Sequence, residues 1–199
     1  MVPGTSEPRP WRLLDRRLLL EAPPWLSVHQ ESVALPTGRV IEDYYRIVLP
    51  EFAVILPRTA SGQYVLVRGY KHGLGRLTLM APAGLMDAGE EPLAAARREL
   101  LEETGYEAPE WQALGCYVVD GNRQCGRMHL FAARGAVRRR AAHEDEMEQL
   151  QVVLLSRAEV VAALRAGEFG TLAGGGGVGI ALLLTSEGDG PAPGPARVP

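Results

Sequence analysis

Three glutamates near the middle of the chain, Glu99, Glu102 and Glu103, have the spacing that places their side chains on one face of an α-helix. At about 100° per residue, positions i, i+3 and i+4 lie close together on the helix surface. Like charges at this spacing repel one another, so something must offset the repulsion. A hard divalent cation such as Mg²⁺ or Mn²⁺ prefers oxygen ligands and would do so. The alternative is a solvated acidic face that pairs with Arg97 and Arg98.

A wider pattern surrounds these glutamates. Gly84 is followed after five residues by Glu90, and seven more residues lead to Arg98–Leu100, then Glu102–Glu103 and Gly105–Tyr106. This arrangement resembles the Nudix box, G-x5-E-x7-R-E-U-x-E-E-x-G-U, in which U is a bulky aliphatic residue. At ~6% usage per residue type, a chance match to all the fixed residues has a probability on the order of 10⁻⁹ per starting position. The one departure is the aromatic Tyr106 at the last U position.

The resemblance implies a metal-dependent catalytic site on this helix. In the family, box glutamates bind Mg²⁺ or Mn²⁺ together with a backbone carbonyl, here that of Ala83, and an acidic residue in a late loop removes a proton from the attacking water. The position that matches this base is Glu146, with Glu148 as an adjacent base or metal ligand. The alternative for residues 145–148 is a charged surface loop. Arg98 can hold one carboxylate by a charge-assisted hydrogen bond. The candidate metal ligands are thus Glu99, Glu102, Glu103 and Ala83, and the candidate catalytic residues are Arg98, Glu102, Glu146 and Glu148.

Similarity outside the box, over roughly residues 38–185, resembles the ADP-ribose and nucleoside-diphosphate-sugar pyrophosphatase branch of the family. It is carried by Val67–Lys71 and Ala81–Gly84, and it implies hydrolysis of the diphosphate that joins a nucleoside to a second group. Two departures weaken ADP-ribose specificity. Met80 stands where the branch usually has Glu, and Asp120–Arg127 lacks the branch's S-P-G type of loop. The candidate substrate-binding residues are Lys71, Arg68, Arg123, Arg127 and Tyr44.

Two other functions stay open. One is a Nudix hydrolase of another substrate class, such as dinucleoside polyphosphates, coenzyme A or capped RNA, because the box itself does not discriminate among them. The other is a non-catalytic Nudix regulator that binds a nucleotide. Such regulators carry an added DNA-binding domain, and residues 168–199 are too few and too rich in Gly and Pro for a winged helix. The intact set of box glutamates also favours an enzyme.

The remaining sequence predicts an α/β protein with a mixed sheet and helices on its faces. The resemblance sharpens this prediction to an α/β/α sandwich. One helix is expected over Glu91–Thr104, and a second begins at the capping box Ser156–Glu159 and stops at Gly167. Gly174–Gly177 is expected to be a flexible loop before a final helix. Strands are expected at Phe52–Leu56, Tyr64–Arg68, Leu77–Leu79, Leu114–Val119, Met128–Ala132 and Val152–Leu155. The histidines His72, His129 and His143 lack metal-ligand spacing and are interpreted as structural.

Composition predicts a soluble, cytoplasmic protein. The 199 residues are 46% hydrophobic and 23% charged, with a net charge of −3. This balance favours neither DNA nor an anionic membrane as a partner. Two cysteines cannot form a disulfide framework, and no leader with an apolar core is visible. The apolar run Val178–Leu184 is too short to span a bilayer. We expect an N-terminal arm (1–45), a Nudix hydrolase domain (46–186) and a disordered tail (187–199).

The arm is expected to make the protein a homodimer. Residues Trp25–Tyr45 contain the β-prone stretch Ser32–Leu35. The resemblance implies that such a segment pairs two subunits and completes the nucleoside pocket of the partner. The alternative is that the arm adds an edge strand to its own sheet. Trp11, Trp25 and Tyr44 are candidates to stack on a base.

Overall fold

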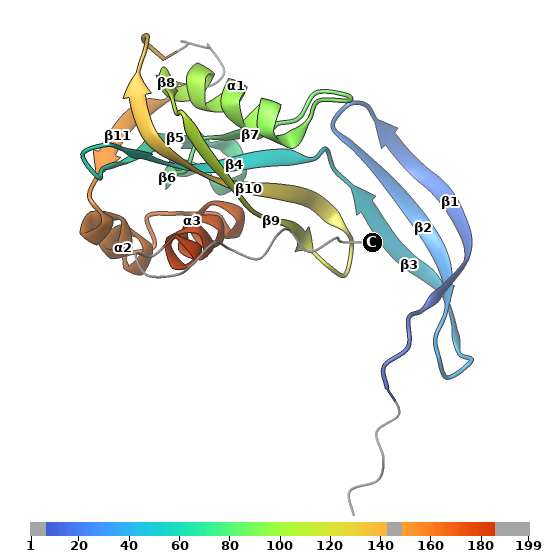
Figure 1. The fold of residues 1–199 in the computed structure, drawn as a ribbon. Helices are drawn as coiled ribbons and strands as arrows, with labels where there is room; N and C mark the ends of the chain where they lie inside the picture. The colour runs from blue at the N-terminus through green and yellow to red at the C-terminus, as the bar shows by residue number, and fades with distance from the viewer. Residues whose placement is uncertain (1–6, 143–148, 186–199) are drawn as a thin grey trace, which may run out of the picture. The chain divides into compact units, whose positions relative to one another are not determined.

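The computed structural model describes residues 7–142 and 149–185, and the chain divides into two compact units. The first unit is Met1–Pro50 with Asp120–Gly126, and the second is Glu51–Val119 with Arg127–Pro199. The elements drawn in Figure 1 are, in chain order, β1 (Arg12–Ala22), β2 (Leu26–Ala34), β3 (Val40–Val48), β4 (Phe52–Thr59), β5 (Tyr64–Lys71), the 3₁₀ turn η1 (His72–Leu74), β6 (Arg76–Met80), β7 (Ala83–Leu85), α1 (Pro92–Thr104), β8 (Tyr106–Glu107), β9 (Glu110–Asp120), β10 (Cys125–Arg138), β11 (Gln151–Leu155), α2 (Arg157–Arg165) and α3 (Leu172–Leu184).

The second unit is a mixed sheet between two layers of helix. Its strand order is β11-β5-β4-β10-β8, with β6 paired to β5, β7 to β4 and β9 to β10. Strands β4 and β10 run parallel, whereas β5 runs antiparallel to both β6 and β11. Val54 and Leu56 of β4 pack in a core with α2 and α3, and the alternate residues Ala53 and Ile55 pack in a second core with α1. Figure 1 shows α1 on one face of this sheet and α2 and α3 on the other. The predicted α/β/α sandwich is confirmed.

Helix α1 confirms the helix predicted over Glu91–Thr104. Pro92 occupies the first turn, where its missing N–H is no loss, and Gly105 ends the helix with a φ of 73°. Gly105 has a second constraint, because a Cβ there would overlap the carbonyl oxygen of Arg140. The apolar side of the helix buries Ala95, Ala96 and Leu100 against the sheet. The glutamate side of the helix faces strand β7, where Glu103 is buried.

The two C-terminal helices give one confirmed and one wrong prediction. Helix α2 begins at the predicted capping box, in which Ser156 and Glu159 each bond the other's backbone N–H. The expected flexible loop at Gly174–Gly177 is wrong, because these glycines lie inside α3, which Thr171 caps at its N-terminus. Buried residues of α3, among them Val178 and Ala181, anchor it in the core and outweigh the low helix propensity of glycine. In the described part of the chain, no helix has both the length and the hydropathy of a membrane span.

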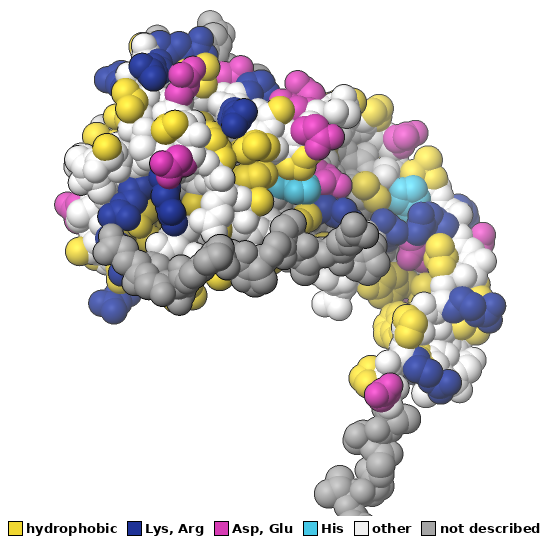
Figure 2. All heavy atoms as spheres, viewed as in Figure 1, with side chains coloured by type: hydrophobic (Ala, Val, Ile, Leu, Met, Phe, Trp, Pro, Cys, Tyr) yellow, Lys and Arg dark blue, Asp and Glu magenta, His cyan; other side chains and the backbone are white. Residues whose placement is uncertain are grey.

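The first unit is a three-stranded antiparallel sheet, in the order β1-β2-β3. Its strands pair with one another, so the expected alternative, an edge strand added to the large sheet, is not the arrangement observed among the described residues. Glu31 is buried in the middle of this sheet and forms an ion pair with Arg16, 2.7 Å away. Every residue from Arg12 to Glu21 is exposed, including five leucines. Figure 2 shows hydrophobic and basic side chains interspersed on the surface of this unit.

Candidate active site

The side chain of Arg98 gathers three of the box glutamates around one guanidinium group. Its Nε and Nη2 donate to the two carboxylate oxygens of Glu90, at 3.1 and 2.9 Å. Its Nη1 donates to Glu99 at 2.5 Å and to Glu102 at 3.2 Å. Nη2 also donates to the carbonyl oxygen of Leu85, 2.9 Å away, in the strand that precedes the box loop. We refer to Arg98, Glu90, Glu99 and Glu102 as the Arg98 cluster, which offsets much of the repulsion among the carboxylates.

Electrostatics within the Arg98 cluster favour the charged forms. The pKa of Glu90 lies below its ordinary value, first because Arg98 donates to its carboxylate and second because the backbone N–H of Asp87 does so. The pKa of Arg98 is raised, chiefly by its hydrogen bonds to Glu90 and then by those to Glu99 and Glu102. Glu90 is therefore a carboxylate, and Arg98 a cation, at neutral pH.

Close approach between α1 and strand β7 also sets the positions of Glu99 and Glu103. The Glu99 carboxylate lies so close to Gly84 that a Cβ on residue 84 would overlap it. This close approach explains why the first residue of the box is glycine. Glu103 is buried, and its Oε2 accepts a hydrogen bond from the backbone N–H of Ala83 at 2.9 Å. Strand β7 pairs with β4 at Val54, Ala53 and Phe52. The two carboxylates are thus held against a strand of the central sheet.

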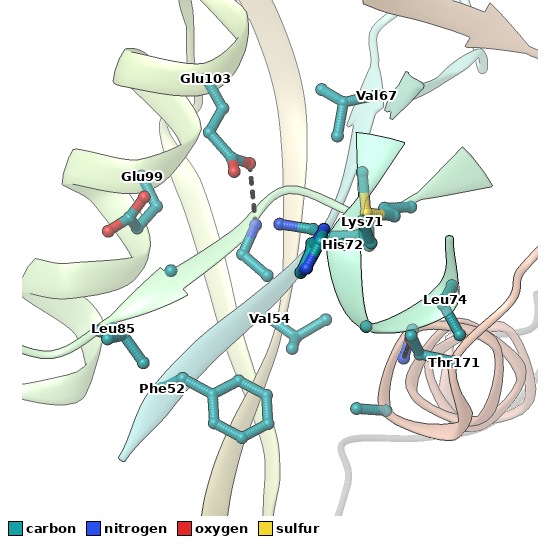
Figure 3. A pocket seen from close by; sticks show the side chains of 17 residues that line it. Phe52, Val54, Val67, Lys71, His72, Leu74, Leu85, Glu99, Glu103 and Thr171 are labelled. Carbon is teal, nitrogen blue, oxygen red and sulfur yellow. Dashed lines mark hydrogen bonds between the residues drawn. The ribbon is translucent and has the colours of Figure 1, made fainter. Parts of the chain in front are cut away.

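Glu99 and Glu103 line a cavity of about 680 Å³ within the second unit. Figure 3 shows these glutamates on one side, Leu74 and Thr171 on the other, and Lys71 and His72 between them. The dashed line in Figure 3 is the hydrogen bond from Ala83 to Glu103. Apolar residues from the central sheet and from the connection between β6 and β7 complete the wall, namely Phe52, Val54, Val67, Met80, Ala81 and Leu85. The cavity therefore combines an acidic wall, a lysine and an apolar lining.

The donor atoms at the acidic wall suit a hard divalent cation. Glu99 and Glu103 present carboxylate oxygens to one cavity, and oxygen is the donor that Mg²⁺ and Mn²⁺ prefer. Within residues 7–142 and 149–185, no three His, Cys, Asp or Glu side chains come close enough to hold a metal ion by themselves. Glu102, the third expected ligand, instead bonds Arg98. Two glutamates thus fit the ion, and its other ligands must be backbone, water, substrate or residues outside the described ranges.

The structure places the expected substrate-binding residues at different locations. Lys71 lines the cavity, whereas Arg68 pairs with Glu168 at 2.9 Å and Arg127 lies 3.7 Å from Glu51. Tyr44 and Arg123 belong to the first unit. There, the Tyr44 hydroxyl donates to the carbonyl oxygen of Asn122, and Arg123 lies 3.6 Å from Asp120. The candidate base Glu146 and its neighbour Glu148 lie outside the described residues, as do His143 and the expected tail at 187–199.

Several residues of the cavity wall carry no signal that sequence reasoning could use. His72, interpreted above as structural, lines the cavity beside Lys71. Thr171, Ala173 and Gly174 reach the cavity from the start of α3, far along the chain from the box. Only the assembly of η1 and α3 around the sheet brings them together. By contrast, His129 lies outside the cavity lining and bonds Glu51 at 2.6 Å.

Comparison with known proteins defines the class to which this fold and site belong. The model of the NUDIX domain matches residues 49–172. The model of the nucleoside diphosphate sugar hydrolase N-terminal domain matches residues 11–47, which include the whole three-stranded sheet except Val48. The chain therefore belongs to the Nudix family.

Individual relatives and one solved structure resemble the chain over most of its length. The chain is 29% identical to the ADP-ribose pyrophosphatase of Bacillus subtilis (strain 168), over 67% of this chain and 73% of the relative. It is 28% identical to the methanol dehydrogenase activator of Bacillus methanolicus, over 70% of this chain and 76% of the relative. A crystal structure of an ADP compounds hydrolase has the same fold, with a TM-score of 0.77 and 22% identity over 92% of this chain and 99% of that one.

Replacement of Glu90 should destabilise the protein in a pH-dependent manner. Because the pKa of Glu90 is below its ordinary 4.5 in the folded protein, its bond to Arg98 contributes stability above that pH. This contribution is lost as the pH falls through the lowered pKa. Glu90→Gln should therefore reduce the free energy of unfolding by about 1–3 kcal/mol at pH 7, and by less at pH 4.

Urea unfolding at both pH values measures this difference. Glu91→Gln is the matched control, because Glu91 is exposed and its side chain makes no cap hydrogen bond to α1. Equal destabilisation by Glu90→Gln at pH 7 and pH 4 would show that the charge of Glu90 does not stabilise the fold.

Proposed function

We propose that this protein is a Mg²⁺-dependent hydrolase that cleaves the diphosphate of a nucleoside diphosphate joined to another group, with ADP-ribose or another nucleotide sugar as substrate. The observation that carries the proposal is the convergence of Glu99, Glu103 and Lys71 on one cavity. Carboxylates suit the cation, and an ammonium group suits a phosphate oxygen. The match of residues 11–47 to a nucleoside diphosphate sugar hydrolase domain supports the substrate class.

The residues of the cavity divide the work of such a reaction. Glu99 and Glu103, with the carbonyl of Ala83, would hold Mg²⁺, or Mn²⁺ in its place. When bound, the cation supplies positive charge that offsets the charge of the diphosphate and acidifies water. Arg98 orients Glu99 through the 2.5 Å hydrogen bond and so acts through that ligand. Lys71 would bind a diphosphate oxygen, and the apolar wall would exclude bulk water from the reacting bond.

The base rests on the family resemblance, whereas Arg123, Arg127 and Tyr44 are proposed as substrate contacts from their residue types. Glu146 would remove the proton from the attacking water, with Glu148 as an adjacent base or metal ligand. Glu102 would join the metal ligands if a bound cation drew it away from Arg98. Arg68 and Arg127, both in the second unit, would contact the substrate if Glu168 and Glu51 released them.

The substrate class requires a direct screen. One relative is named as an ADP-ribose pyrophosphatase and another as a methanol dehydrogenase activator, so the names of the relatives do not determine the substrate class of this protein. A screen would cover nucleotide sugars, dinucleoside polyphosphates, coenzyme A and capped RNA, with products resolved by mass. If nucleotide sugars are hydrolysed faster than the other compounds, the result supports the proposal. Binding without hydrolysis of any compound would favour a nucleotide-binding regulator instead.

Loss of the Glu103 charge should abolish most of the activity. Glu103→Gln keeps an oxygen that can accept the Ala83 N–H, so the fold should survive. It removes a charged ligand, and kcat should fall on the order of 10²-fold or more. Steady-state hydrolysis with Mg²⁺ measures this effect.

Glu107→Gln provides the control, because it removes an exposed carboxylate just beyond the same helix. Activity of Glu103→Gln equal to that of the wild type, or full wild-type activity in excess EDTA, would refute the metal-dependent mechanism.

We also propose that the protein is a cytoplasmic homodimer that pairs through the first unit. Strand β1 is at the edge of its sheet, and its leucines are exposed, Leu20 to 53%. A long edge strand that exposes several leucines to water invites pairing with another chain. A second copy of the chain is the partner that the family resemblance favours.

Charges on β1 should convert the dimer into monomers. We expect light scattering to find the wild type dimeric at micromolar concentration and the double variant Leu18→Lys, Leu20→Lys monomeric, because paired lysines disfavour association at a sheet edge. Leu77→Lys is a matched control on the second unit, where Leu77 is exposed to 61%. A monomeric wild type would exclude this model of assembly.

A further inference from the structure

The linker between α2 and α3 is attached to strand β6 by one buried hydroxyl group. Thr78, which is 1% exposed, donates its hydroxyl hydrogen to the carbonyl oxygen of Glu168 at 2.9 Å. The same oxygen of Thr78 accepts the backbone N–H of Gly170 at 2.7 Å. One hydroxyl can make both bonds at once, since it has one donor and two acceptor positions. The backbone N–H of Leu79 also donates to Glu168, at 3.1 Å, so the linker follows the end of β6.

This attachment also brings the linker close to the turn η1. A Cβ at Gly170 would lie 2.7 Å from Cδ1 of Leu74 and 3.0 Å from Oγ1 of Thr78, so a larger residue there would require these side chains to shift. Leu74 lines the cavity. Arg68 and Glu168 pair at 2.9 Å over the same linker, but both side chains are more than a third exposed. Such a pair contributes little, so the main polar attachments are the two bonds of the Thr78 hydroxyl and the backbone bond from Leu79.

The linker leads directly into the wall of the cavity that faces the glutamates. Thr171 follows Gly170, and its hydroxyl caps the N-terminus of α3 by accepting the N–H of Gly174 at 3.0 Å. Thr171, Ala173 and Gly174 all line the cavity. Figure 3 shows Thr171 and Leu74 across the cavity from Glu99 and Glu103. The width of the cavity thus depends on where the linker holds the first turn of α3.

We propose that Thr78 is a positioning residue that sets the substrate-binding wall formed by the first turn of α3. The inference rests on the proposed function in one respect, namely that this cavity receives the substrate. Thr78 does not reach the cavity itself and acts through Gly170 and Thr171. Its effect should therefore appear in substrate binding, whereas the glutamates on the opposite wall keep their bonds to Arg98 and Ala83.

Thr78→Val tests the proposal, because valine has the same shape and makes neither hydrogen bond. The N–H of Gly170 then loses its partner, and the linker should loosen. We expect KM to rise roughly tenfold, corresponding to ~1.4 kcal/mol, while kcat changes less than about threefold. Thr78→Ser keeps the hydroxyl and should restore KM. Thr185→Val, which removes a hydroxyl bond at the opposite end of α3, is the matched control and should leave KM unchanged.

The kinetic comparison uses whichever compound the wild type hydrolyses fastest, and amide hydrogen exchange over residues 170–175 provides a second measurement. Faster exchange there in Thr78→Val than in Thr185→Val supports the proposal. Unchanged KM in folded Thr78→Val, or a fall in kcat with unchanged KM, overturns it. If the wild type hydrolyses none of the tested compounds, the proposed function fails. In that case, amide exchange over residues 170–175 that is the same in Thr78→Val as in the wild type would separately overturn the positioning role. Should Thr78→Val fail to fold, Thr78→Cys, which weakens both bonds, replaces it in the same comparison.

Discussion

The contact between Arg98 and the carboxylates of Glu90, Glu99 and Glu102 is the interaction on which the site depends. Glu99, Glu102 and Glu103 lie on one face of α1 and repel one another, and the helix must also stay packed on the sheet. A planar guanidinium group can bond several carboxylates at once because its donors point in different directions. Its fifth bond, to the carbonyl oxygen of Leu85, ties the cluster to the strand before the box loop.

This arrangement explains why the helix and the strand beside it behave as one structural unit. Glu99 lies against Gly84, and Glu103 accepts the N–H of Ala83, so the acidic face contacts the backbone of β7 as well as the side chain of Arg98. Backbone positions in a paired strand are more rigid than side chains, and β7 is paired with β4. The opposite wall of the cavity is attached less directly, through the linker before α3 and the hydroxyl of Thr78. Charged hydrogen bonds thus hold the glutamate wall of the cavity, whereas two neutral hydrogen bonds of Thr78 hold the wall formed by the first turn of α3.

The features that the sequence predicted are those encoded by local spacing. Helix α1, its glutamate face and the capping box of α2 depend on residues within a few positions of one another, and all three are present. The glycine run of α3 was mispredicted because packing of Val178 and Ala181 outweighs the local preference of glycine. Strand β1 was not predicted, since its consecutive leucines show no alternation of polar and apolar residues. His72 and Thr171 could not be assigned to the cavity, because the contacts that place them there are made between distant parts of the chain.

The central claim is that Arg98 organises the glutamates for a divalent cation, and titration of the wild type and of Arg98→Lys with Mn²⁺ tests it most directly. The EPR signal of free Mn²⁺ reports the affinity without any need for a substrate. Lysine keeps the charge but cannot bond several carboxylates in the same geometry. The account predicts that Arg98→Lys binds Mn²⁺ about 10- to 100-fold more weakly, with an unchanged far-UV circular dichroism spectrum. Equal affinity in the two proteins would contradict it.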